Sequence, residues 1–253
     1  MPDLMYILLA GIFLPLFPMS MVFNAIFDKV KYAWLRALLI IAWPLVGLLL
    51  VLNSDLVIPH WVMTLALGTS LLYALRLLTL REVNQWSGFL ATSLWGLLWL
   101  TLFQGDSAVL IIWFAIGMSL PLVLLVFLSA FLEKQFGAAY TDLYGGLART
   151  VPRFTAILIT VIMAAVATPL FPTFFIIFDM VVETVSVMPL YAMALLLIWL
   201  LWSWAGARLV QGLIVGRQSK VKVVDFGGPT IGFYSIVILA LAISGIYMGM
   251  VIL

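Results

Sequence analysis

The sequence predicts an all-α protein, a polytopic bundle of about 8 transmembrane helices with almost nothing soluble between them. Of its 253 residues, 66% are hydrophobic and only 9% are charged, whereas soluble domains carry about 25% charged residues. The mean hydropathy is +1.27. Apolar runs recur along the chain at lengths close to the ~20 residues that cross a bilayer, so most of the surface is expected to face lipid.

Apolar runs cover most of the chain, and one of them, at 172–187, is short. They lie at 4–27, 32–52, 59–80, 86–103, 108–132, 154–168, 172–187, 190–207 and 229–253. Pro15 and Pro18 in the first run, and Pro44 and Pro121 in later runs, are expected to kink their helices. Membrane helices tolerate such kinks when neighbouring groups satisfy the freed carbonyls.

A proline-broken helix is expected near residues 169–187. Pro169 and Pro172 are three residues apart, and two prolines at that spacing cannot both lie inside a regular helix. No Gly-rich or Ser-rich linker divides the sequence, so residues 1–253 are expected to form a single membrane domain.

Basic residues gather in short stretches between the apolar runs. The clusters are Lys29/Lys31/Arg36, Arg76/Arg81, Lys134/Arg149/Arg153 and Arg208/Arg217/Lys220/Lys222. Because Lys and Arg favour the cytoplasmic side, all four clusters are expected inside and the N-terminus outside. Three runs separate the last two clusters, however, which breaks this rule. Either the last basic loop lies outside, or the segment 169–187 is broken and does not complete a crossing.

The composition offers little for metal, cofactor or nucleic-acid chemistry. The sequence has no cysteine and one histidine, which excludes thiolate sites and paired histidine ligation of haem. A net charge of +2 is too small to indicate nucleic acid. No phosphate loop, zinc spacing or nucleophile elbow occurs, so no cofactor, metal or covalent catalysis is expected. The ten tryptophans are interpreted as interfacial anchors.

Asp179 is the main candidate for proton chemistry, because it lies inside an apolar run, where an ionisable group is costly. Glu183 follows four residues later, so a helix would place both carboxyls on one face. Two carboxyls in apolar surroundings cannot both ionise cheaply, and a carboxyl that exchanges a proton could serve a proton relay. Equally, Asp179 could pair with an arginine of another helix or subunit, and Glu183 could lie in the interface.

Arg76, Arg81 and His60 are weaker candidates. Arg76 and Arg81 lie near the end of one run, where long basic side chains usually reach back to the interface. His60 lies at the start of the same run, beside Trp61. An isolated interfacial histidine is more often a hydrogen-bonding cap than a proton carrier.

A glycine turn between two apolar runs is the most specific motif in the sequence. The turn and the residues after it are Tyr144-Gly145-Gly146-Leu147, Arg149 and Pro152. This order of glycine turn, basic residue and helix-opening proline resembles the antiporter-like, proton-conducting membrane subunits of respiratory complex I (chain-4 and chain-5 type) and of multisubunit cation/proton antiporters. Residues 91–96 also resemble that family's serine-rich helix, and Asp179 falls where the family has an acidic residue or lysine in a broken helix.

The sequence also departs from that family's pattern. The family has two inverted repeats that each give half of an ion path. Here residues 1–53 resemble its two opening helices, and residues 59–253 resemble its second half. The family's central histidine or lysine has no counterpart between Trp113 and Gly117. Asp179 could therefore end a half-path, but no continuous relay of charged residues is visible.

The resemblance implies a shortened antiporter-like subunit of a multi-subunit membrane complex, which conducts protons with a partner or scaffolds a subunit that does. Such complexes couple ion flow to redox chemistry, to cation exchange or, in some bacteria, to inorganic-carbon transport. The short length favours a specialised complex such as the inorganic-carbon type. The expected partners are other membrane subunits and the lipid bilayer, without nucleic acid, in a bacterial inner membrane.

Two alternatives stay open. The chain could be a purely structural membrane anchor with decayed relay residues, which the missing central lysine and histidine favour and Asp179 disfavours. It could also be a membrane-arm subunit of a quinone-linked oxidoreductase, with His60 and Arg81 near the quinone headgroup. No catalytic activity of the chain's own is expected.

Overall fold

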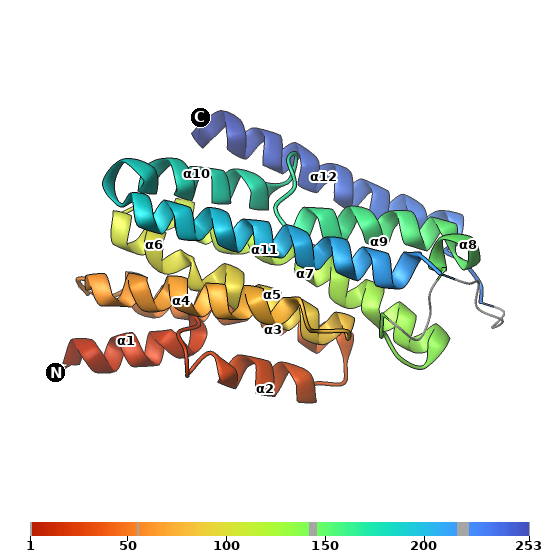
Figure 1. Cartoon of the computed structure of the whole chain (residues 1–253), viewed down its shortest axis with the longest axis horizontal. Coiled ribbons are helices and arrows are strands. Elements are labelled where there is room, and N and C mark those ends of the chain that lie inside the picture. The colour runs from red at the N-terminus through yellow and green to blue at the C-terminus, as the bar shows by residue number, and fades with distance from the viewer. Residues whose placement is uncertain (1, 55, 142–145, 217–222, 253) are drawn as a thin grey trace.

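The computed structural model describes residues 2–54, 56–141, 146–216 and 223–252, and in those ranges the regular structure is helical apart from one bridge between Glu82 and Tyr140. The helices lie side by side in an elongated bundle (Figure 1). They are α1 (Pro2–Phe13), α2 (Met21–Lys29), α3 (Ala33–Leu52), α4 (His60–Leu77), α5 (Val83–Gly96), α6 (Leu98–Gln104), α7 (Ala108–Phe136), α8 (Leu147–Thr150), α9 (Pro152–Ala165), α10 (Pro172–Val187), α11 (Pro189–Ile214) and α12 (Gly228–Ile252).

Three pairs of helices each form one crossing of the bundle. Helices α1 and α2, and likewise α9 and α10, lie end to end (Figure 1), and α5 passes into α6 at Leu97. These three pairs and the unbroken α3, α4, α7, α11 and α12 make eight crossings in the described part of the chain. Five of the crossings are long and apolar enough to span a membrane by length and composition. The expected polytopic helical bundle is confirmed.

Two details of the expected spans are wrong. The first run, 4–27, is not one kinked helix but two helices separated at residues 14–20, and the runs 154–168 and 172–187 are halves of one crossing. Pro44 and Pro121 both lie inside continuous helices, α3 and α7. Helices α9 and α10 together make one crossing, so the segment 169–187 does not cross on its own. Of the two alternatives for the last basic cluster, an outside loop or a broken helix, the structure supports the broken helix.

Among the described residues, the Lys and Arg side chains lie at one end of the bundle, the cationic end, where α2, α4, α7 and α11 end and α3, α5, α9 and α12 begin (Figure 1). The described basic residues there are Lys29, Lys31, Arg36, Arg76, Arg81, Lys134, Arg149, Arg153 and Arg208; Arg217, Lys220 and Lys222 lie outside the described residues. The opposite end, the acidic end, holds Asp106, Asp179 and Glu183. Since Lys and Arg favour the cytoplasmic side, the cationic end is predicted to face the cytoplasm.

Prolines and one aspartate fix where several helices start. Helices α9, α10 and α11 each open on a proline, which lacks the N–H that the first turn would leave unpaired. At the start of α9, the Asp225 carboxylate accepts the backbone N–H of Arg153 at 2.9 Å and of Phe154 at 3.0 Å. The segment before α12 therefore caps α9, and the carboxylate also favours the positive end of that helix dipole.

Tryptophans do not all serve as the interfacial anchors that the sequence predicts. Trp86, Trp95, Trp99 and Trp202 are fully buried. Several indole N–H groups donate hydrogen bonds inside the bundle instead, and two of the three breaks depend on them.

The first break, between α1 and α2, is held by donors from other helices. The indole of Trp43 donates to the Ile12 carbonyl and that of Trp99 to the Leu14 carbonyl, both at 3.0 Å. The Thr69 hydroxyl accepts the Phe17 N–H at 2.9 Å. These bonds satisfy backbone groups that a helix end leaves free and that lipid cannot satisfy.

The second break, between α9 and α10, has the same kind of support. Ala167 and Leu170 adopt positive φ angles of 59° and 96°, which are costly without glycine and persist only when the surroundings enforce them. The Trp199 indole on α11 donates to the Ala167 carbonyl at 3.0 Å. On α12, Gly245 lies directly against Leu170 and Phe171, so the backbones touch where a side chain would not fit.

Adding one methyl group at Gly245 is expected to destabilise the bundle. A Cβ there would lie 2.7 Å from the carbonyl carbon of Phe171, so Gly245→Ala must displace the break, at a cost of about 1–3 kcal/mol. Gly232→Ala on the same helix is the control, because its Cβ would meet nothing within 4 Å. Thermal unfolding of the detergent-solubilised protein measures both. Equal melting temperatures for the two variants would contradict the close approach.

Candidate functional site

The two carboxyls singled out in the sequence lie on the second half of the broken crossing. Asp179 is half-buried on α10 and Glu183, one turn further on, is exposed. Asp179 is seven residues beyond Pro172, the first residue of α10, or about 10 Å along the helix. The break therefore starts a fresh helix inside the bundle, and that helix carries both carboxyls toward the acidic end (Figure 1).

Asp106 joins these two carboxyls from another part of the chain. It lies in the short connection between α6 and α7, and its charge and those of Asp179 and Glu183 are close enough to repel one another. Burial, and to a lesser extent the Glu183 charge, raises the pKa of Asp106 to about 6. The sequence analysis missed Asp106, because a loop aspartate between two apolar runs gives no sign of which helix it will face.

The same end of the bundle is fastened by polar and aromatic contacts. Gln104 at the end of α6 donates to the Thr184 hydroxyl of α10 at 3.2 Å. The ring of His60, which begins α4, lies 4.8 Å from that of Phe103. His60 is therefore at the acidic end, yet its described contact is with an aromatic ring.

A second group of polar side chains lies buried among α4, α5 and α11. The hydroxyls of Ser70 and Ser93 are 3.0 Å apart, and each donates to the other residue's carbonyl, at 2.7 and 2.8 Å. The Trp202 indole donates to the Ser93 hydroxyl at 2.8 Å. Two residues after Ser93 on α5, the Trp95 indole donates to the Ser119 hydroxyl of α7 at 3.0 Å. Two members of this central polar cluster, Ser93 and Trp95, lie in the stretch 91–96 that resembles the family's serine-rich helix.

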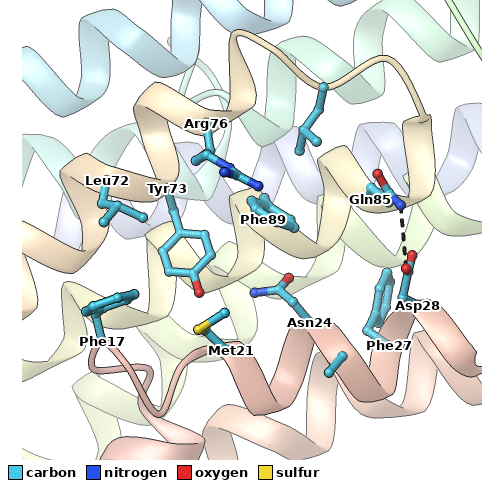
Figure 2. Close-up of a pocket in the computed structure, with 12 residues that line it drawn as sticks. Phe17, Met21, Asn24, Phe27, Asp28, Leu72, Tyr73, Arg76, Gln85 and Phe89 are labelled. Atoms are coloured by element: carbon cyan, nitrogen blue, oxygen red, sulfur yellow. Dashed lines mark hydrogen bonds between the residues drawn. The ribbon is translucent and has the colours of Figure 1, made fainter.

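The third polar feature is a pocket at the cationic end, with a cavity volume of ≈ 560 Å³ between α2, α4 and α5. Figure 2 shows Arg76 above Phe89, and the two are 5.8 Å apart from guanidinium carbon to ring centroid. The Asn24 amide donates to the Thr92 hydroxyl at 2.9 Å. Tyr73, whose ring points toward α2 in Figure 2, donates to Ser20 at 3.0 Å. Two side chains that line the pocket, Asn24 and Tyr73, are thus hydrogen-bonded to hydroxyl groups inside the bundle.

Within the described ranges, no hydrogen bond connects this pocket or the central polar cluster to Asp179. Several buried polar atoms of the bundle lack a partner among the described residues, including Asn24 Oδ1, Gln104 Oε1, Asp106 Oδ2, Ser129 Oγ and Thr173 Oγ1. Buried polar atoms of this kind commonly bind water. Any route through the bundle would therefore have to use water or a neighbouring subunit.

The remaining sequence candidates lie apart from Asp179. Arg76 is in the cationic-end pocket, and Arg81 lies just beyond the end of α4 at the same end. His60 and Arg81 are at opposite ends of α4, a helix of 18 residues, or about 27 Å. One quinone headgroup could not contact both. In the described part of the chain, no group of three or more His, Cys, Asp or Glu residues is arranged to hold a metal ion.

No protein-family model matches the sequence, and no curated protein matches it. Solved structures do share its fold. A chain of respiratory complex I from Thermus thermophilus with bound NADH matches 98% of this chain and 55% of its own length, at a TM-score of 0.83 and 19% identity. A chain of the archaeal membrane-bound sulfane sulfur reductase, a respiratory membrane complex, matches 96% of this chain and 52% of its own length. Its TM-score is 0.79 and its sequence identity is 13%.

A chain of the Mrp complex from a Dietzia species matches 96% of this chain and 55% of its own length, at a TM-score of 0.72 and 13% identity. This chain thus spans about half the length of these structural neighbours. The fold is that of membrane subunits in such complexes, and the resemblance that the sequence predicted is confirmed at the level of the fold.

Removing the Asp106 charge should change how stability depends on pH. A carboxyl whose pKa is raised from 3.8 to about 6 on folding stabilises the folded state when protonated, and this contribution is lost as the pH rises through 6. Asp106→Asn should therefore raise the melting temperature at neutral pH and leave it unchanged near pH ~4. Asp28→Asn, at the cationic end, is the control. A variant that gains nothing at neutral pH would show that burial and the Glu183 charge do not raise the pKa of Asp106.

Proposed function

We propose that this chain is an antiporter-like subunit of a multi-subunit, proton-coupled membrane complex, and that Asp179 takes up and releases protons at the acidic end. The observation that carries the proposal is the position of Asp179. It is a half-buried carboxyl on the second half of a broken crossing, in a fold shared with chains of complex I and the Mrp complex. Ionisable groups within a membrane span are costly, so they are functional candidates.

The surroundings of Asp179 favour proton exchange over a fixed ion pair. Its charged neighbours are Glu183 and Asp106, and every described arginine lies at the cationic end. An arginine partner would therefore have to come from another subunit. Without such a partner, repulsion among three carboxyls is relieved most simply by a proton, which can be gained from and lost to the adjacent aqueous phase.

The path from Asp179 to the cytoplasm is proposed to need a partner. The central polar cluster and the cationic-end pocket could receive protons from that side, but the described hydrogen bonds do not join them to Asp179. We therefore propose conduction at the contact with a neighbouring membrane subunit, with this chain supplying the outer end of the route.

A scaffold is the second candidate function. The lack of described hydrogen bonds between Asp179 and the other polar groups favours it. If the polar clusters serve only to hold helices together, then this chain positions a conducting partner and Asp179 contacts that partner. The wide separation of His60 and Arg81 removes the support that the sequence offered for a quinone site. Which process is coupled, whether redox chemistry, cation exchange or inorganic-carbon transport, depends on the subunits that co-purify from the expected bacterial inner membrane.

The test is proton flux through the assembled complex carrying Asp179→Asn. This change keeps shape and hydrogen-bonding capacity but removes the titratable proton. The complex is purified with its partner subunits and reconstituted in vesicles that contain a pH-sensitive dye. Flux is expected to fall by about tenfold or more, while Asp179→Glu, which restores a carboxyl, should recover part of it.

Two further variants make the result interpretable. Ser186→Ala, on the exposed end of α10, should leave flux unchanged, and Glu183→Gln should reduce it less than Asp179→Asn does. Subunit composition is measured for every variant. Normal flux in an intact Asp179→Asn complex would reject the relay and leave the scaffold function; loss of a subunit from that complex would identify Asp179 as a partner contact.

A further inference from the structure

The pocket between α2, α4 and α5 holds one positive and one negative side chain that are not paired with each other. Arg76 is the last residue but one of α4, and Asp28 is the last but one of α2. Both line the pocket and both are exposed, yet among the described residues no ion pair joins them. Figure 2 shows them apart, with Arg76 over Phe89 and Asp28 beside Gln85. The pocket therefore offers a separate group for each charge of a zwitterion.

Neighbouring side chains restrain the two charged groups but leave bonding capacity unused. The guanidinium carbon of Arg76 lies 5.8 Å from the centroid of the Phe89 ring, and its N–H groups have no acceptor among the described residues. The Gln85 amide donates to Asp28 Oδ2 at a long 3.5 Å, which leaves Oδ1 for another donor. Asn24 Oδ1, on a third lining residue, is buried without a partner in the described part of the chain. Donors thus lie at one side of the pocket and acceptors at the other.

This arrangement matches a phosphate joined to a primary ammonium. A guanidinium binds phosphate through charge-assisted hydrogen bonds, whereas an ammonium carries three donors and needs acceptors such as a carboxylate or an amide oxygen. Helices α2 and α4 both end at the pocket, and helix C-termini favour cations. A group that carries only negative charge would be repelled by Asp28, and a quaternary ammonium has no N–H to donate.

A second hollow runs along α4 and meets the first at Arg76. Its cavity volume is ≈ 410 Å³. Leu72 and Arg76 line both hollows, and Gly68 and Leu75 are among the residues that line the second. Gly68 keeps it open, because a Cβ there would meet nothing within 4 Å. Gly68 is eight residues before Arg76, so this hollow extends about 12 Å from the charged end toward the middle of the bundle.

The first pocket also becomes apolar toward the middle of the bundle. Phe17 and Met21 line it there, and they are 41% and 58% exposed. Met21 is seven residues before Asp28 on α2, or about 10 Å along the helix. Two apolar tracks of similar length therefore lead inward from the same charged pair. Two acyl chains on one headgroup fit this shape, and a small soluble zwitterion would use neither track.

We propose that the pocket and the hollow beside it bind one molecule of phosphatidylethanolamine. Arg76 holds the phosphate, and Asp28 and Asn24 Oδ1 accept from the ammonium. One acyl chain lies along Met21 and the other along Gly68. The lipid lies in the leaflet at the cationic end and joins α2 to α4. The site does not depend on whether Asp179 carries protons.

The test is native mass spectrometry of the full chain, together with any subunits that co-purify, after delipidation and incubation in detergent with one of three lipids. These are phosphatidylethanolamine, phosphatidylglycerol and phosphatidylcholine with identical acyl chains. Phosphatidylethanolamine should be retained best. Arg76→Gln should lower its retention by about tenfold, as expected when charge-assisted hydrogen bonds are lost.

Two further variants separate headgroup from acyl-chain binding. Asp28→Asn should lower retention of phosphatidylethanolamine and raise that of phosphatidylglycerol, because the group that attracts the ammonium and repels the anion is gone. Gly68→Leu should lower retention of phosphatidylethanolamine without changing the order of preference, because the new side chain occupies the space of one acyl chain. Its control is Gly232→Leu, at another glycine with nothing within 4 Å of its Cβ.

The control for charge is Arg149→Gln, at another exposed position of the cationic end, which should leave binding unchanged. Size-exclusion profiles check that each variant is folded. Equal retention of the three lipids, or equal losses in Arg76→Gln and Arg149→Gln, would overturn the site. Displacement of the lipid by millimolar phosphoethanolamine, with no effect of Gly68→Leu, would show a site for a soluble zwitterion instead. Loss of a partner subunit in Arg76→Gln, with lipid retention unchanged, would show that the pocket binds protein.

Discussion

A helix that stops inside a bilayer leaves backbone N–H and carbonyl groups where no water can bind them, and the protein itself must satisfy these groups. The bundle meets this constraint at both of its irregular breaks by the same means. Indole N–H groups of Trp43, Trp99 and Trp199 donate to carbonyls at the breaks. Glycine brings the neighbouring helix close at each place, Gly47 against the end of α1 and Gly245 against residues 170–171. Without this support, the helix that carries Asp179 could not begin in the interior.

The broken helix and the distribution of charge together define the functional proposal. Because α9 and α10 make one crossing, all described cations fall at one end, and the carboxyls of Asp106, Asp179 and Glu183 fall at the other. In this arrangement, the proton-exchanging carboxyl of the proposed function lies toward the aqueous phase opposite the cationic end.

Much of the fold could be predicted from the sequence, because its signals are local. Apolar length and proline position predicted the helical bundle, and the expected boundaries of the seventh run are those of α10. What could not be predicted depends on contacts between distant segments. Asp106 becomes a neighbour of Glu183 through the packing of α6 and α7 near α10, and Trp202 reaches Ser93 across 109 residues. The tryptophans were misread for the same reason, since composition cannot distinguish an interfacial indole from a buried donor.

The pairing of α4 with α11 also limits the order in which the bundle can assemble during synthesis. The two helices contact each other along their length, and the hydrogen bond of 2.7 Å between Thr64 and Tyr191 joins residues 127 positions apart. At ordinary translation rates, roughly ten seconds separate their emergence from the ribosome. During that interval, the face of α4 that will pack against α11 has only lipid, an insertase or a partner subunit to cover it. Completion of the interior therefore waits for α11, and a truncated nascent chain is expected to be a substrate for membrane quality control.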